Sequence, residues 1–241
     1  MKLDVLAVGA HPDDLELGCG GTLALLAKQG KKVGILHLTR GERGTRGTVE
    51  ERRREAEDAA KALGAVELGF LDCGDGAFRT GEAEEDALIE RLRDWRPELI
   101  LAPSASDRHP DHSRSWQLVQ SASFYAGLRN RHSEGGPPYR PGAVFSYMQH
   151  DPFEPSFIVD ISSVWETKLE ALRAYRSQLY QTGAEKKGAE TKVASREFWL
   201  AVEGRARHFG LMINVELGEP FWSRLPLAVS DLSTIVPGGL R

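Results

Sequence analysis

Apolar runs rich in branched residues alternate with helix-like segments four times in the first 130 residues, and this alternation constrains the fold most. Short strands are predicted over 3–9, 32–38, 66–71 and 98–102, and helices over 22–31, 49–64, 82–95 and 112–128. Parallel strands need a crossover connection, which is usually a helix. We therefore expect an α/β fold with a Rossmann-like, mostly parallel sheet flanked by helices on both faces.

The second half of the chain has a different pattern. A segment rich in Gly, Pro and Arg over 127–143 predicts a long loop. Beyond it, strands are predicted over 143–148 and 156–161, and helices over 162–180 and 196–209. We expect a single domain over 1–241, in which residues 1–130 form a parallel βα core and residues 142–241 form a C-terminal α+β extension that completes the site.

Charge and composition exclude several kinds of partner. The chain has 31 Lys and Arg residues against 35 Asp and Glu, a formal charge of −4, so it has no global basic field to hold nucleic acid or an anionic membrane. No run approaches the ~20 apolar residues of a membrane span, and Asp4 interrupts the first apolar stretch, unlike a signal peptide. Two cysteines are too few for a disulfide framework. We expect a cytoplasmic protein without nucleic-acid or membrane partners.

Imidazoles and carboxylates are concentrated in two loops. The sequence A-H-P-D-D-L-E over 10–16 follows the first predicted strand, and D-R-H-P-D-H over 107–112 follows the fourth. In an open parallel sheet, ligands bind beyond the carboxyl ends of the strands where the strand order reverses. In the common strand orders this crevice lies between the first and fourth strands. We therefore expect both loops to meet at one site.

The two loops together offer the ligands of a metal ion. A catalytic zinc usually takes three ligands from His, Asp and Glu and keeps one position open for water, whose pKa it lowers toward ~7. His11, Asp14 and His112 satisfy that count. Helix capping would explain either loop alone equally well, because Asp is common at helix starts. Helix capping explains less well why two such loops would meet at the point where the strand order reverses.

The remaining polar residues of the loops suit acid–base chemistry. Asp13 would be free to accept a proton from the metal-bound water, and His109 could face the oxygen on which negative charge develops. Asp111 follows His109 by two residues, close enough to fix its tautomer or raise its pKa. A dinucleotide site is disfavoured because residues 18–21 lack the G-x-G-x-x-G spacing.

The motifs at 10–16 and 109–112 resemble those of the LmbE/PIG-L family of metal-dependent N-acetylglucosamine deacetylases, and the resemblance extends to the segment 208–221. It implies zinc, or another divalent metal such as Fe²⁺, bound by His11, Asp14 and His112. It also implies Asp13 as the general base and later proton donor. His109, paired with Asp111, would stabilise the tetrahedral oxyanion.

Within this family the chain looks most like the bacillithiol-pathway enzymes, which remove acetate from N-acetylglucosaminyl malate. We expect Arg52, Arg108 and His150 to contact the substrate. Arg52 interrupts an otherwise apolar helical row, where a merely solvated arginine is unexpected, and it is the residue that we expect to hold a carboxylate of the malate. Arg53 lies on a neighbouring row, and spacing alone does not exclude it. The resemblance also predicts a homo-oligomer, with a hexamer as the specific candidate.

These observations predict a zinc-dependent amidohydrolase that acts on a small GlcNAc-containing metabolite, with N-acetylglucosaminyl malate first among the candidates. Diacetylchitobiose and a mycothiol precursor or conjugate are alternatives, since the catalytic residues do not distinguish them. A metal-dependent phosphoesterase is a second class, although two-metal sites usually need more carboxylate ligands than these loops offer. A non-catalytic sugar-binding protein is a third, against which the presence of Asp13 argues.

Overall fold

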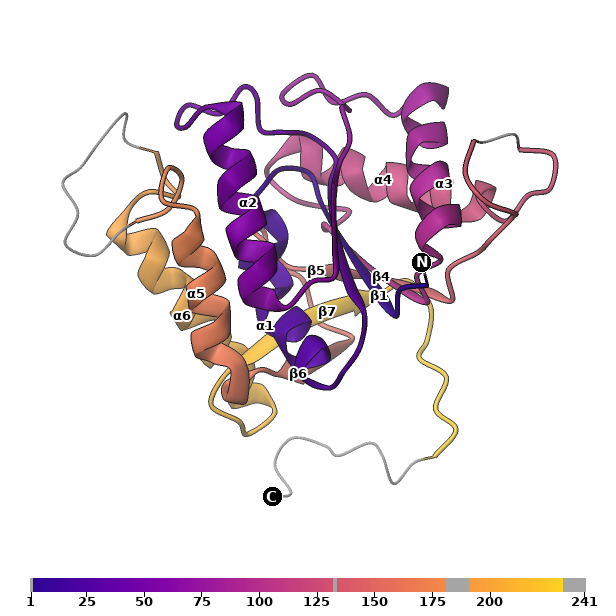
Figure 1. Cartoon of the computed structure of the whole chain (residues 1–241). Coiled ribbons are helices and arrows are strands. Elements are labelled where there is room, and N and C mark those ends of the chain that lie inside the picture. Colours follow the sequence, from indigo (N-terminus) through magenta and orange to yellow (C-terminus); the bar gives the residue numbers. More distant parts are fainter. Residues whose placement is uncertain (1, 132–133, 181–190, 232–241) are drawn as a thin grey trace.

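The computed structural model describes residues 2–131, 134–180 and 191–231, and these residues form a seven-stranded sheet with helices on both faces (Figure 1). The strands are β1 (Val5–Gly9), β2 (Val33–His37), β3 (Glu67–Phe70), β4 (Leu99–Ala102), β5 (Ala143–Tyr147), β6 (Phe157–Asp160) and β7 (Gly218–Ser223). Their order is β3-β2-β1-β4-β5-β7-β6. The first five strands pair in parallel, and β7 is antiparallel to both of its neighbours. The predicted α/β class is confirmed.

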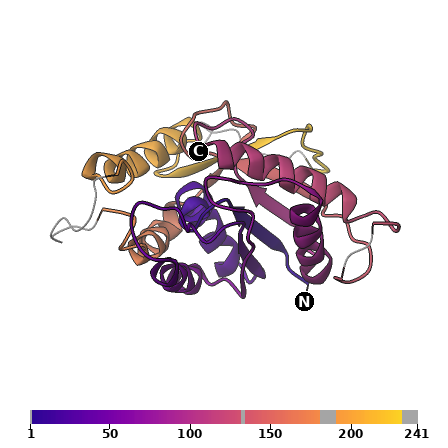
Figure 2. The ribbon, with the colours of Figure 1, turned by 90° about the horizontal axis from the view of Figure 1, so that it is seen from above.

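The helices cover the two faces of the sheet in separate groups (Figure 2). They are α1 (Asp14–Lys28), α2 (Val49–Leu63), α3 (Glu82–Trp95), α4 (Pro110–Tyr125), α5 (Trp165–Ala174) and α6 (Arg196–Met212). Val5 and Ala7 pack with α1, α2, α5 and α6, whereas Leu6 and Val8 pack with α3 and α4. This is the alternation that a strand buried on both faces requires. No helix in the described part of the chain is long and apolar enough to cross a membrane.

Local signals explain where α2 begins and ends and where α4 begins. Thr48 caps α2 by accepting the N–H of Glu51, whose carboxylate accepts the N–H of Thr48 in return, and Gly64 ends the helix with a φ of 74°. His109 caps α4, and Pro110 is its first residue, where a missing N–H costs no hydrogen bond. The H-P-D-H motif therefore forms the first turn of α4.

Three segments differ from the sequence-based prediction. Helix α1 begins at Asp14 instead of residue 22 and is broken at Cys19, whose φ is −142°. The helix predicted over 162–180 is a 3-10 turn at Ser162–Val164 followed by α5, which ends at Ala174. Strand β7 was not predicted, because Pro220 in its interior lowers the strand signal. It lies between β5 and β6, so the strands of the extension join the same sheet as the βα core.

Candidate metal and active site

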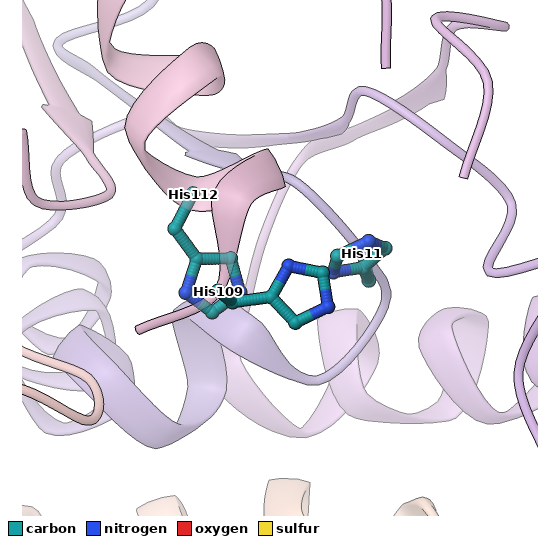
Figure 3. A group of neighbouring side chains, drawn as sticks. All are labelled: His11, His109 and His112. Carbon is teal, nitrogen blue, oxygen red and sulfur yellow. The ribbon is translucent and has the colours of Figure 1, made fainter. Parts of the chain in front are cut away.

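The two predicted loops meet where the strand order reverses. β1 lies between β2 and β4 in the sheet, so the carboxyl ends of β1 and β4 are neighbours. His11 follows β1, and His109 and His112 lie at the start of α4, which follows β4. Each of these three rings offers a nitrogen within 4.8 Å of the others. Figure 3 shows the rings of His109 and His112 coming from the start of α4 and lying beside His11.

Asp14 lies between two of these imidazoles. Its Oδ1 is 3.2 Å from Nε2 of His112, and its Oδ2 is 3.4 Å from Nδ1 of His11. Oδ2 also accepts the backbone N–H of His11 at 2.8 Å. Burial opposes a charge on Asp14, but His112 and His11 outweigh it and hold the pKa of the carboxyl well below its usual range. An ionised carboxylate therefore joins the two rings.

In both His11 and His112, the ring nitrogen that faces away from Asp14 also lies close to a carboxylate. Nε2 of His11 is 3.2 Å from Asp75 and 3.3 Å from Asp111, and Nδ1 of His112 is 3.0 Å from Asp107. Burial lowers the pKa of His112, but Asp14 and Asp107 raise it to about 9. Histidines that bind metals almost always donate their other ring N–H to a carboxylate, a carbonyl or water.

This arrangement fits a divalent cation. The outer carboxylates leave Nδ1 of His11 and Nε2 of His112 for a ligand, and both of these nitrogens already face Asp14. Two imidazoles and one carboxylate form a donor set of the kind that catalytic zinc sites use.

Asp13 lies beside this set and has an unusual backbone conformation. Its φ is 101°, in the left-handed region that side chains other than glycine rarely adopt. Burial raises the pKa of Asp13 to about 7, although Arg52, whose Nη2 is 3.8 Å from Oδ2, lowers it. A buried carboxyl next to the candidate metal site is suited to exchange a proton with a ligand bound there.

The relation of His109 to Asp111 differs from the expected one. The Asp111 carboxylate does not pair with His109: it lies against His11 and accepts the N–H of Gly76 at 2.8 Å. The contact with His109 runs through the backbone, because Nδ1 of His109 accepts the N–H of Asp111 at 3.3 Å. Burial, followed by the charges of His11 and His112, lowers the pKa of His109. A neutral ring that accepts at Nδ1 carries its proton on Nε2, so His109 can act as a donor.

The three expected substrate contacts have different environments. Arg52 is buried, and its Nη1 and Nη2 donate to the carbonyls of Gly41 (3.0 Å) and Pro12 (2.6 Å). Arg108 is exposed. The ring of His150 stacks on that of His112, with centroids 5.7 Å apart. The guanidinium of Arg52 is thus hydrogen-bonded to the backbone of two loops, while Arg108 and His150 are more accessible to a ligand.

Sequence reasoning missed the roles of Asp75, Asp107 and Gln149. Asp107 lies within the D-R-H-P-D-H motif, but the sequence alone assigns it no role. Asp75 follows β3, and Gln149 follows β5 and donates from Nε2 to Oδ1 of Asp14 at 2.7 Å. All three residues lie beyond the carboxyl ends of parallel strands. Ligands of parallel sheets bind beyond the carboxyl ends of the strands. Applied to the third and fifth strands as well as to the first and fourth, this rule also points to the loops that contain Asp75 and Gln149.

The chain forms a Rossmann-like sheet, and two histidines lie where its strand order reverses. Each histidine contacts a carboxylate through the ring nitrogen that faces away from Asp14. These features define a class of α/β proteins with a candidate metal site. Residues 6–123 match the family model PIG-L, described as GlcNAc-PI de-N-acetylase. The chain is 34% identical over 188 residues to the diacetylchitobiose deacetylase of Thermococcus kodakarensis, covering 72% of this chain and 69% of that protein. The chain therefore belongs to the PIG-L family, as its motifs predicted.

Other relatives differ in their named activities. The chain is 31% identical to the 4-oxalmesaconate hydratase of Pseudomonas putida, covering 72% of this chain and 73% of that one. It is 29% identical to the probable N-acetyl-alpha-D-glucosaminyl L-malate deacetylase 2 of Bacillus cereus, covering 84% and 96%. The crystal structure of a conserved protein from Thermus thermophilus is similar over 95% of this chain and 98% of that one, with a TM-score of 0.86 and 39% identity. Family membership alone thus leaves deacetylation and hydration to be distinguished.

Proposed function

We propose that this protein is a metal-dependent deacetylase that hydrolyses the N-acetyl group of a small GlcNAc-containing molecule. The observation that carries the proposal is the placement of Asp13. It is a buried carboxyl that interacts electrostatically with His11, Asp14 and His112, and its Oδ2 lies 3.8 Å from Nη2 of Arg52. A base outside the ligand set, together with the donor His109, supplies the groups that amide hydrolysis needs.

Each residue has a separate role in this proposal. Zn²⁺, or Fe²⁺ as the alternative, would be held by His11, Asp14 and His112 and would supply Lewis acidity toward the acetyl carbonyl and toward a water molecule. Asp13 accepts the proton of the attacking water and returns it to the departing amine. His109 donates its Nε2–H to the carbonyl oxygen as negative charge develops there. Asp111 acts through His11, which its carboxylate contacts.

Among substrates of this class we favour N-acetylglucosaminyl malate. The similarity to the Bacillus cereus relative supports this choice. A malate group carries two carboxylates, which arginine can hold through paired, charge-assisted hydrogen bonds. Arg108 is exposed immediately before His109, and Arg43 is exposed and donates its backbone N–H to Asp75 at 2.7 Å. We propose that these two arginines hold the malate carboxylates, because Arg108 precedes His109 in the chain and the backbone of Arg43 contacts Asp75. Diacetylchitobiose offers no anionic group for them.

An assay that separates the candidate reactions tests this function. Purified, metal-loaded protein is given N-acetylglucosaminyl malate, N-acetylglucosamine or diacetylchitobiose, and acetate release is measured. Parallel samples measure hydration of 4-oxalmesaconate and release of phosphate from a sugar phosphate. We expect acetate release, fastest from the malate compound, and none from a His11→Ala control. Hydration or phosphate release without acetate release would overturn the deacetylase assignment.

We further propose that the enzyme works in the cytoplasm as a homo-oligomer, with a hexamer as the specific candidate, and without nucleic-acid or membrane partners. Cell fractionation tests the location. Light scattering coupled to size exclusion gives the mass of the assembly, and a monomeric mass would contradict this part of the proposal.

A further inference from the structure

The break in α1 leaves helical hydrogen-bonding groups without their usual partners. Cys19 departs from helical geometry, with φ −142° and ψ 15°. In an uninterrupted helix the carbonyl of Leu17 would accept the N–H of Gly21, four residues later. That N–H instead donates to Oε1 of Glu219 at 2.9 Å, and the N–H of Thr22 donates to Oε2 at 2.7 Å. Glu219 thereby caps the second half of α1.

The freed carbonyl of Leu17 is satisfied by two cationic side chains. Nζ of Lys168, in α5, donates to it at 3.0 Å, and Nη2 of Arg205, in α6, donates at 2.9 Å. Lys168 also pairs with Glu219 at 2.6 Å, with both side chains buried. Residues of α5, α6 and β7 therefore hold the break in the helix that begins with Asp14.

Arg205 also connects this break to Asp14 by a second route. Its Nη1 donates to the backbone carbonyl of Gln149, just beyond β5. The Gln149 side chain is buried, and its Nε2 donates to Oδ1 of Asp14 at 2.7 Å. One arginine thus holds the backbone on both sides of the Asp14 carboxylate: Leu17 in the same helix, and Gln149 across from it.

We propose that Gln149, held in place by Arg205, is a positioning residue that fixes the orientation of the Asp14 carboxylate toward a bound cation. This inference rests on the proposed function, in which Asp14 is a metal ligand. The carboxylate is held at both oxygens, since Oδ2 accepts the N–H of His11 and Oδ1 accepts from Gln149. It cannot rotate without losing one of these bonds. Gln149 provides this restraint as a neutral donor, so the site keeps the negative charge that attracts the cation.

The test compares two buried glutamines. Gln149→Met keeps the length of the side chain and removes the donor to Asp14. Gln178→Met is the matched control, because Gln178 is similarly buried but donates to the carbonyl of Arg46 and to Ser177. The affinity for Zn²⁺ is measured by competition with a chromophoric chelator, and the visible spectrum of the Co²⁺-loaded protein reports the coordination. Thermal unfolding of the metal-free variants reports damage to the fold.

We expect Gln149→Met to weaken Zn²⁺ binding by about 10–100-fold, the usual range for loss of a partner behind a metal ligand. Its Co²⁺ spectrum should change, and Arg205→Met should shift affinity in the same direction. Gln178→Met should keep the wild-type affinity and spectrum. Unchanged affinity in Gln149→Met, or equal losses in both glutamine variants, would overturn the positioning role. Failure of the wild-type protein to bind one divalent cation per chain would instead overturn the proposed function itself.

Discussion

Oδ1 of Asp107 lies 3.0 Å from Nδ1 of His112, and this contact leaves Nε2 of His112 to face Asp14. The other oxygen of Asp107 accepts the backbone N–H groups of His150 at 3.0 Å and Asp151 at 3.4 Å. Burial opposes ionisation, but His112 and the backbone N–H groups of His109 and His150 hold the pKa of Asp107 below its usual range. One ionised carboxylate therefore orients the ring and ties the loop after β4 to the loop after β5.

Asp107→Asn should weaken metal binding while preserving the fold. An amide can still accept hydrogen bonds from the backbone, but it lacks the charge that fixes the tautomer of His112 and makes its ring a better ligand. We expect a loss of about 10–100-fold in Zn²⁺ affinity, measured by chelator competition. Wild-type affinity in this variant would show that Asp107 only shapes the loop.

Removal of the metal should abolish activity reversibly. We expect one divalent cation per chain, lost on dialysis against a strong chelator together with acetate release, and both restored by adding Zn²⁺. His11→Ala and His112→Ala should not regain the cation, because each removes one of three proposed ligands. Metal content measured by mass spectrometry would contradict the ligand set if both variants kept a full equivalent.

Asp13→Asn should separate proton transfer from metal binding. The amide cannot accept the proton of the attacking water, so kcat should fall by ~10²–10⁴, the usual contribution of a general acid–base group. Zn²⁺ content should stay at the wild-type level, since Asp13 is not a proposed ligand. Turnover close to that of the wild type would remove Asp13 from the mechanism.

Arg108 and Arg52 should respond differently to the substrate. Arg108→Ala should lower kcat/KM for N-acetylglucosaminyl malate by roughly 10–100-fold, the scale of a hydrogen bond to a charged group, and leave N-acetylglucosamine almost unaffected. Arg52→Lys should reduce the hydrolysis of both substrates, because its donors hold the carbonyls of Pro12 and Gly41 beside Asp13. Steady-state kinetics on the two substrates decide between these patterns. A malate-selective loss in Arg52→Lys would place the malate at Arg52 instead.

Lys168→Met should destabilise the protein strongly. It would leave Glu219 as a buried carboxylate without its cation, and breaking a buried pair in this way costs about 3–5 kcal/mol of unfolding free energy. Urea unfolding followed by circular dichroism measures the change. The exposed pair Arg53–Glu57 is a control, since Arg53→Met should cost about 0–1 kcal/mol. Equal costs for the two variants would mean that the buried pair contributes no more than a surface one.

The sequence by itself determined the α/β class, the mostly parallel sheet and the two loops that form the site. These features depend on local properties: the periodicity of apolar residues, the helix caps, and the presence of both motifs directly after strands. The position of His11 beside His109 and His112 follows from them, because parallel strands that are neighbours in the sheet end at the same edge.

The tertiary structure alone decided which group each polar side chain meets. Asp107 and Asp111 lie within five residues of each other, yet one contacts His112 and the other contacts His11. Asp107 lies in the loop before α4 and Asp111 lies in the first turn of α4, and the distance along the chain does not distinguish their partners. The contacts of Asp14 with Gln149 and of Gly21 with Glu219 join residues more than 130 positions apart. Such pairs form only when β5, β7 and α1 are packed together, and no periodicity in the sequence encodes that packing.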